Sequence, residues 1–183
     1  MSQLSFSSFD SSLMVRDTQS RYLLATAEQI LDAARQAIER KMQRGTSFTS
    51  PAAVKEYLCA KLAGFEHEVF AVLFLDTHHR LIEYAEMFRG TIDGASVYPR
   101  ELVKEALRHN AAAVIISHNH PSGNPEPSQA DKVLTQRLNE ALRLVDVRVL
   151  DHVIVAGNST ASFAERGLIW GHLRKRKIKH AKA

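Results

Sequence analysis

Residues 117–131 read SHNHPSGNPEPSQAD and place His118 and His120 two positions apart, ahead of a proline-interrupted loop that ends in Ser128 and Asp131. Two neutral nitrogen ligands and one carboxylate suit Zn²⁺, and three protein ligands leave a fourth tetrahedral position for water, as in catalytic zinc sites. A structural zinc site would need four ligands, usually with thiolates, and the chain has one cysteine, far away in sequence. The segment therefore predicts a catalytic zinc site held by the two histidines and the aspartate.

The same segment also has a purely structural interpretation. A His-x-His pair can belong to a polar loop, and Ser128 with Asp131 resembles a capping box at the start of an amphipathic helix. The whole pattern, His-x-His-Pro-x6-Ser-x2-Asp, fixes several residue identities at fixed spacings, which favours a metal site. The two interpretations are compatible, because the first turn of a helix is a rigid place from which to present a carboxylate to a metal.

The pattern resembles the JAMM (MPN+) zinc metalloprotease motif, and its flanks resemble the RadC family within that group. The likeness covers about residues 65–170. The flanking matches, in order, are Glu68-Val69-Phe70 followed by AVLFLD, Gly90-Thr91, Pro99-Arg100-Glu101, Ala111-Ala112 and Leu150-Asp151-His152. The resemblance implies an α/β fold of the α+β kind, a cytidine-deaminase-like JAB/MPN domain with a mixed β-sheet flanked by helices.

The resemblance also implies roles for two further residues in a metallopeptidase that cleaves peptide or isopeptide bonds of a polypeptide substrate. Glu68 would be the general base that accepts a proton from zinc-activated water and passes it to the leaving amine. Glu66 has the same strand parity, but no phenylalanine follows it two positions later. Ser128 would donate its hydroxyl hydrogen bond to the oxyanion that forms on the attacked carbonyl.

The charge distribution leaves a second function open. The net charge is +4, but six of the 24 Lys and Arg lie in residues 172–183, HLRKRKIKHAKA, and the remainder of the chain is slightly acidic. This basic tail could bind nucleic acid, an acidic partner or nothing. With the RadC family's traditional link to DNA repair, it suggests the alternative of a recombination-associated factor that binds DNA or a DNA-bound partner, with or without hydrolysis. A metal-stabilised binding module without turnover is a third hypothesis.

Composition predicts a compact protein without a membrane anchor. The chain of 183 residues, 45% of them apolar, suffices for one well-buried domain with extensions. It contains no apolar run near the roughly 20 residues needed to cross a bilayer, and its start lacks the features of a signal peptide. The single cysteine, Cys59, excludes an internal disulfide. We therefore expect a cytoplasmic protein, and a homo-oligomer remains open.

The expected organisation is an N-terminal extension with two helices over residues 1–63, a RadC-like JAB/MPN catalytic domain over residues 64–171, and the basic tail. The first 20 residues show no helical or alternating period. Thr26 and Gln29 resemble a capping box that opens the first helix, and Ser50 followed by Pro51 opens the second. Full-length family members carry a helix-hairpin-helix region with no counterpart here, so the chain resembles a short form.

Hydrophobic patterning predicts the elements of the catalytic domain. They are a β-hairpin over 68–75 and 81–88, a helix over 99–110, a buried strand over 113–116 that leads into the metal loop, a helix over 128–145, a strand over 148–156 and a short closing helix over 162–167. Asp151 and His152 lie in the last strand. They could support a metal ligand or line the substrate groove, or form a purely structural strand pair, the interpretation that the sequence favours.

Overall fold

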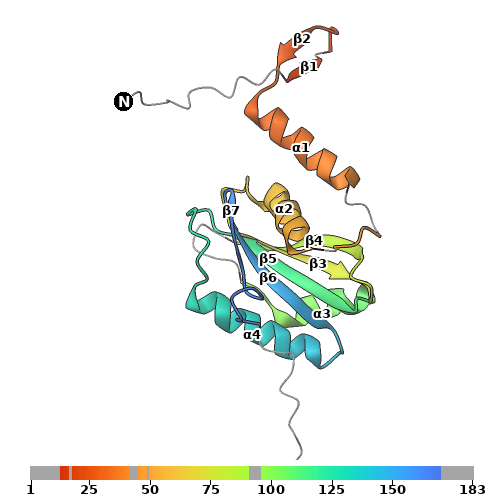
Figure 1. Ribbon diagram of the computed structural model, residues 1–183, viewed down its shortest axis with the longest axis vertical. Coiled ribbons are helices and arrows are strands. Elements are labelled where there is room, and N and C mark those ends of the chain that lie inside the picture. The colour runs from red at the N-terminus through yellow and green to blue at the C-terminus, as the bar shows by residue number, and fades with distance from the viewer. Residues whose placement is uncertain (1–12, 17, 42–44, 49, 91–95, 170–183) are drawn as a thin grey trace, which may run out of the picture. The chain divides into compact units, whose positions relative to one another are not determined.

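The computed structural model describes residues 13–16, 18–41, 45–48, 50–90 and 96–169, which fall into two compact units divided between Lys41 and Met42. The smaller unit contains β1 (Met14–Arg16), β2 (Tyr22–Leu24) and α1 (Ala27–Lys41) (Figure 1). The larger unit contains the sheet and the candidate site.

The smaller unit combines one confirmed prediction with one correction. The predicted capping box opens α1, since the Thr26 amide donates to Gln29 Oε1 at 2.9 Å and the Gln29 amide donates to Thr26 Oγ1 at 3.2 Å. The sequence shows no hydrophobic period near its start, so no strand was predicted there. The structure corrects this for residues 14–24, where β1 and β2 pair in an antiparallel hairpin. Ser20 has a φ of 65° in the connecting turn. Strands of three residues are too short to produce a recognisable alternation.

The larger unit is built around a mixed sheet. Its elements are α2 (Pro51–Leu62), β3 (Val69–Leu75), β4 (Leu81–Arg89), α3 (Pro99–Arg108), β5 (Ala113–Asn119), α4 (Gln129–Arg143), β6 (Arg148–Ala156) and β7 (Ser159–Ser162). The strand order is β4-β3-β5-β6-β7, and every neighbouring pair is antiparallel except the parallel pair of β5 and β6. The predicted mixed sheet flanked by helices is confirmed.

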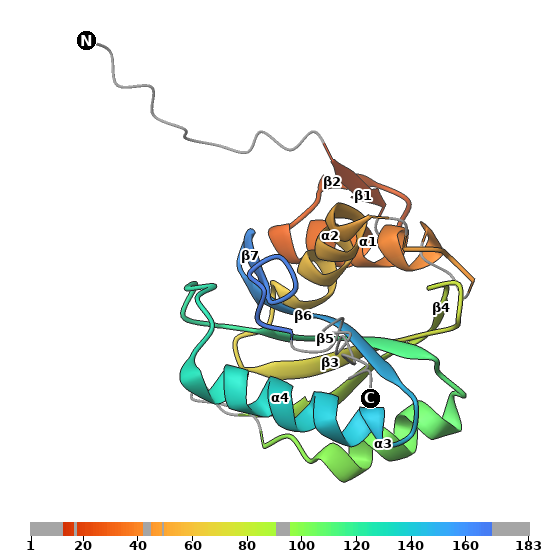
Figure 2. The same cartoon turned by 60° about the horizontal axis from the view of Figure 1, so that its bottom comes forward.

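Helices cover both faces of this sheet. Figures 1 and 2 show α2 on one face and α3 with α4 on the other. The sequence signals for α2 are correct, because the Ser50 side chain accepts a hydrogen bond from the Ala53 amide and Pro51 occupies the first helical position. Since α2 contacts β5, β6 and β7, it belongs with the sheet. The sequence analysis had grouped it with the N-terminal extension.

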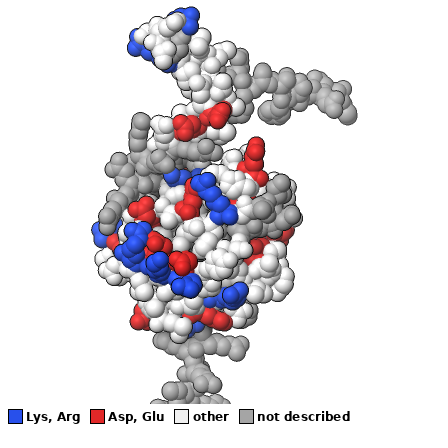
Figure 3. Space-filling model, turned by 180° about the vertical axis from the view of Figure 1, so that it is seen from behind, with Lys and Arg blue, Asp and Glu red and all other residues white. Residues whose placement is uncertain are grey.

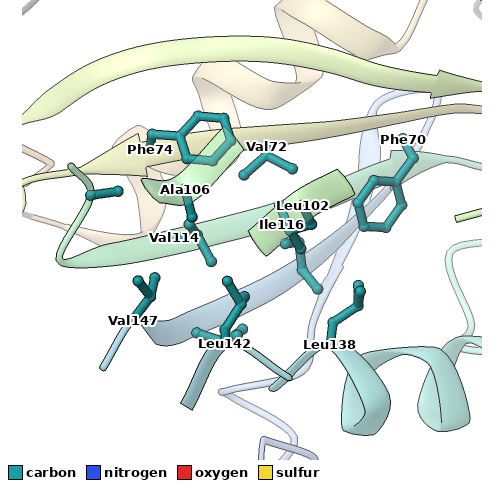
Figure 4. Packing of buried hydrophobic residues seen from close by; sticks show 12 residues of the cluster. Phe70, Val72, Phe74, Leu102, Ala106, Val114, Ile116, Leu138, Leu142 and Val147 are labelled. Carbon is teal, nitrogen blue, oxygen red and sulfur yellow. The ribbon is translucent and has the colours of Figure 1, made fainter. Parts of the chain in front are cut away.

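The core explains why β3 and the first four residues of β5 are continuous apolar runs. All seven residues of β3 are buried, as expected for a central strand covered on both faces. Phe70, Val72 and Phe74 join one cluster with Leu102 of α3 and Leu138 of α4, and Figure 4 shows these side chains converging. The cluster fixes α4 against the sheet, and with it the helix turn that carries Asp131.

Two details near the site differ from the prediction. β5 continues through Asn119, so His118 lies within a strand and not in the loop that follows it. The short helix predicted over 162–167 is wrong. Residues 159–162 form β7 against β6, and residues 163–167 form turns. The cause is tertiary, since the Asp151 carboxylate accepts hydrogen bonds from Ser162 Oγ at 2.6 Å and from the Ala164 amide at 2.9 Å.

Charge on the described surface is mixed. On the face shown in Figure 3, Lys and Arg side chains of the larger unit lie beside Asp and Glu side chains. Arg166, for example, binds Glu126 through two hydrogen bonds of 2.7 and 2.8 Å. The basic segment 172–183 and its predicted nucleic-acid contact lie outside the described residues. No helix in the described ranges is long and apolar enough to cross a membrane.

The packing of α4 makes a stability prediction. Leu138 is fully buried, whereas Val133 on the same helix is 48% exposed. Leu138→Ala should lower the free energy of unfolding by about 2 to 5 kcal/mol, because it leaves a cavity between α4 and the sheet. Val133→Ala, the matched control, should change it by less than about 0.5 kcal/mol. Urea unfolding followed by circular dichroism measures both, and equal effects would contradict the packing described.

Candidate metal centre and its cleft

The carboxyl end of β5 and the first turn of α4 meet at the candidate site. Alternation along β5 places Val114 and Ile116 in the core beneath α3 and α4, and His118 continues that row. His118 is 2% exposed and lies opposite Phe70 in the antiparallel register with β3. His120 follows the strand, its backbone amide still bonded to the carbonyl of Val155 in β6 at 2.8 Å. Backbone pairing with β3 and β6 therefore fixes the backbone positions of both histidines.

His118, His120 and Asp131 offer three ligand atoms that all lie within 4.8 Å of one another. The two histidine Nε2 atoms are 2.9 Å apart. Asp131 Oδ1 lies 3.3 Å from His118 Nε2, and its Oδ2 lies 3.7 Å from His120 Nε2. The structure thus brings together the three residues that the sequence selected as metal ligands.

A capping box fixes the Asp131 carboxylate. The Ser128 amide donates to Asp131 Oδ2 at 2.7 Å, and the Asp131 amide donates to Ser128 Oγ at 3.1 Å. Burial alone would raise the pKa of Asp131, but contacts with His118 and Ser128 outweigh burial and hold this pKa below its ordinary value. The aspartate is therefore ionised, the form in which a carboxylate binds a metal.

The Nδ1 atoms of His118 and His120 both have hydrogen-bond partners in the protein. His120 Nδ1 lies 2.7 Å from the backbone oxygen of Asn124. Because a carbonyl oxygen only accepts, Nδ1 of His120 carries a proton, and in the neutral ring Nε2 presents a lone pair to the cluster. His118 Nδ1 lies 2.8 Å from Nε2 of His152, which is completely buried. Burial lowers the pKa of His152 well below its ordinary value, so this histidine is neutral.

The donor set fits a divalent cation of the zinc type. Two imidazole nitrogens and one carboxylate converge. The second nitrogen of each ring and one carboxylate oxygen have hydrogen-bond partners in the protein, as is normal for metal ligands. Three protein ligands would leave a further coordination position free. The single cysteine, Cys59, belongs to α2 on the other face of the sheet, so sulfur plays no part in the cluster.

An open cleft of about 930 Å³ gives access to the cluster. Glu66, Glu68, Ser128, His120 and Asp131 all line it. Glu68, just before β3, is half-buried, whereas Glu66 is exposed. The cleft therefore contains the predicted base and the predicted oxyanion donor together with two of the three candidate ligands.

Ser128 is oriented by its capping role. Its Oγ accepts the Asp131 amide, and its side chain also contacts the Asp131 carboxylate, which helps to lower the pKa of Asp131. A serine hydroxyl has one donor and two acceptor positions. The cap occupies one acceptor position, so the hydroxyl hydrogen can serve the Asp131 carboxylate or a ligand in the cleft that Ser128 lines.

The sequence analysis missed how Asn119 is used. Its side chain is buried and bonds the segment before β3. Its Oδ1 accepts the Val69 amide at 2.7 Å, and its Nδ2 donates to the carbonyls of Phe65 and His67 at 3.3 and 2.9 Å. One residue between the ligands thus anchors the segment that carries Glu68. These partners lie about 50 positions earlier, so no local pattern could reveal them.

Asp151 and His152, whose role the sequence left open, have different contacts in the structure. Asp151 accepts hydrogen bonds from its neighbour's amide, from Ser162 and from Ala164, and so organises the turn after β7. Burial raises the pKa of Asp151, although these hydrogen bonds oppose the shift. His152 instead contacts the candidate ligand His118. The structural interpretation holds for Asp151, whereas His152 contacts a candidate metal ligand.

Fold and site together define a JAB-type domain with a candidate metal centre. The family model described as RadC-like JAB domain matches residues 48–168. The chain is 62% identical over 150 residues to a UPF0758 protein of Vibrio cholerae, covering 80% of this chain and 94% of that protein. UPF0758 proteins of Nitrosococcus oceani and Methylibium petroleiphilum are 58% and 60% identical, each over 76% of this chain.

The chain belongs to the RadC-like JAB domain family, as its motif and flanks predicted. Its matching part spans 62% and 63% of the length of the Nitrosococcus and Methylibium proteins. The match begins at residue 48 and therefore includes α2. Membership adds weight to the metal centre without naming a substrate.

The Asn119 contacts make the second prediction. Asn119→Ala should lower the free energy of unfolding by about 1 to 3 kcal/mol, since it removes the side-chain acceptor of the buried Val69 amide and the side-chain donor to two backbone carbonyls. Asn158→Ala, in an exposed turn, is the control and should change it by less than about 0.5 kcal/mol. Hydrogen exchange should also show faster exchange at the Val69 amide in the first variant alone. Unchanged protection of that amide would contradict the anchoring role.

Proposed function

We propose that this protein is a zinc-dependent hydrolase of the JAMM type, a metallopeptidase acting on peptide or isopeptide bonds. The observation that carries the proposal is the convergence of two imidazoles and an ionised carboxylate beside an open cleft that His120 and Asp131 line. His118, His120 and Asp131 would hold the ion. When bound, zinc supplies Lewis acidity toward a carbonyl oxygen and lowers the pKa of water.

Glu68 is the proposed proton carrier. It lines the same cleft as His120 and Asp131, and it precedes the strand whose first amide is bonded to Asn119. A carboxylate there can accept the proton of an attacking water and return it to the leaving amine. Positioned proton transfer of this kind contributes about 10² to 10⁴ in rate.

Ser128 is the proposed oxyanion donor. Its cap bond with the Asp131 amide limits the directions in which its hydroxyl can point, and the residue faces the cleft. The hydroxyl would stabilise negative charge on the carbonyl oxygen of the substrate as the bond to water forms. The substrate would be an extended polypeptide, because an open cleft of this volume accepts a chain segment.

The role of Glu68 is tested with linear and lysine-branched peptides in ¹⁸O water, where mass spectrometry detects label in each new carboxyl group. Wild-type protein loaded with zinc should incorporate label, and Glu68→Gln should lose about 10² to 10⁴ in rate while elemental analysis still finds one zinc per chain. His118→Ala, the control for the metal, should lose zinc and hydrolysis together. Cleavage by Glu68→Gln at the wild-type rate would exclude the base role. Stoichiometric zinc without any cleavage by wild-type protein would favour the binding-module alternative.

The chain offers a matched pair of caps for testing Ser128. Ser128 and Ser50 both accept the amide three residues later, but Ser50 caps α2, away from the cluster. Each change to alanine should cost about 0.5 to 2 kcal/mol in stability. Only Ser128→Ala should also reduce turnover, by about 10² to 10³. Equal turnover in the two variants, measured well below their unfolding temperatures, would remove Ser128 from the mechanism.

A further inference from the structure

We propose that Thr135 and His152 form a buried hydrogen-bond chain that holds His118 in the tautomer protonated on Nδ1, so that its Nε2 is free to bind the metal. Both are positioning residues, acting through His118 and not on the substrate. The inference rests on the proposed zinc site and adds to it the groups that set the protonation pattern of one ligand.

The hydrogen-bond chain begins at a backbone carbonyl oxygen of α4. Thr135 Oγ1 lies 2.5 Å from the carbonyl oxygen of Asp131, one helical turn earlier. A carbonyl oxygen can only accept, so the single hydrogen of the Thr135 hydroxyl is committed to this bond. The direction of the first link is fixed without any assumption about the histidines.

The second link follows from the first. Nδ1 of His152 lies 2.6 Å from Thr135 Oγ1, whose hydrogen is already committed. The hydroxyl oxygen can then only accept, which requires that His152 carries a proton on Nδ1. The ring of His152 is fully buried and stacks on Phe163 with centroids 4.6 Å apart. An apolar enclosure of this kind favours the neutral ring, with a bare Nε2.

The third link reaches the candidate ligand. The bare Nε2 of His152 is 2.8 Å from Nδ1 of His118, so His118 must donate from Nδ1. A neutral His118 then presents a lone pair on Nε2, the atom 3.3 Å from Asp131 Oδ1. The opposite tautomer would place a hydrogen at the position that a metal ion would occupy.

The hydrogen-bond chain starts and ends at the same residue, Asp131. The Asp131 carbonyl accepts the first bond, and the Asp131 carboxylate lies beside the last nitrogen. The side chains of Thr135, His152 and His118 are each at most 3% exposed, so water does not compete for these bonds. The placement of α4 against β5 and β6 therefore sets both the carboxylate ligand and the tautomer of the histidine beside it.

Zinc affinity of a matched pair of variants tests the proposal. Thr135→Val removes the hydroxyl at nearly constant shape, whereas Thr135→Ser keeps it. Competition with a chromophoric chelator should show Thr135→Val binding zinc about 10- to 100-fold more weakly than wild type, with Thr135→Ser near wild type. Ser117→Ala is a further control, because it deletes another buried hydroxyl of β5, bonded to the Val153 carbonyl at 2.6 Å, and should leave the affinity unchanged. Circular dichroism and thermal unfolding of the metal-free proteins identify any variant that fails to fold.

The tautomer itself can be read by NMR without metal. In metal-free protein labelled with ¹⁵N-histidine at pH 8, long-range proton–nitrogen correlations should place the His152 proton on Nδ1. A proton on Nε2 of His152, or wild-type zinc affinity in folded Thr135→Val, would overturn the proposal. If His152 is protonated on Nδ1 but wild-type protein binds no zinc, the hydrogen-bond chain stands and the proposed zinc site fails.

Discussion

Ser128 and Asp131 exchange two hydrogen bonds between backbone and side chain at the first turn of α4, and this exchange governs the geometry of the whole centre. It starts the helix, holds one carboxylate oxygen, directs the other toward His118 and keeps the Ser128 side chain at the edge of the cleft. The helix cap and the candidate metal site therefore share the Asp131 carboxylate. A helix whose inner face is fixed in the core is a rigid support for such a turn.

Three consecutive residues at the end of β5 and just after it supply the other half of the centre, and they have different tasks. His118 is bonded inward to His152, and His120 is bonded to the loop at Asn124. Asn119, between them, anchors the segment before β3. Strand alternation makes this division possible, because successive side chains leave the strand on opposite faces. The candidate ligands and the candidate base are thus coupled through one short stretch of backbone.

The ligand cluster could be predicted from sequence because its residues are close together in the chain and fixed in spacing. The main strands and helices were also predictable, since each has a clear apolar period or a cap such as Ser50 with Pro51. What escaped prediction depends on distant partners. Hydrogen bonds to Asp151 favour β7 and a turn where a closing helix was expected. Asn119 bonds residues about 50 positions earlier. Thr135 contacts His152 only because α4 packs on the sheet.

The central claim is that His118, His120 and Asp131 bind zinc with the two Nε2 atoms and the carboxylate. Crystals of the zinc-loaded protein, measured on both sides of the zinc absorption edge, test it most directly. The account predicts one anomalous peak within about 2.0 to 2.2 Å of each of the three ligand atoms, with further coordination open to the cleft. A fully loaded protein whose only peak lies elsewhere, or a peak bound through His152 instead of His118, would contradict it.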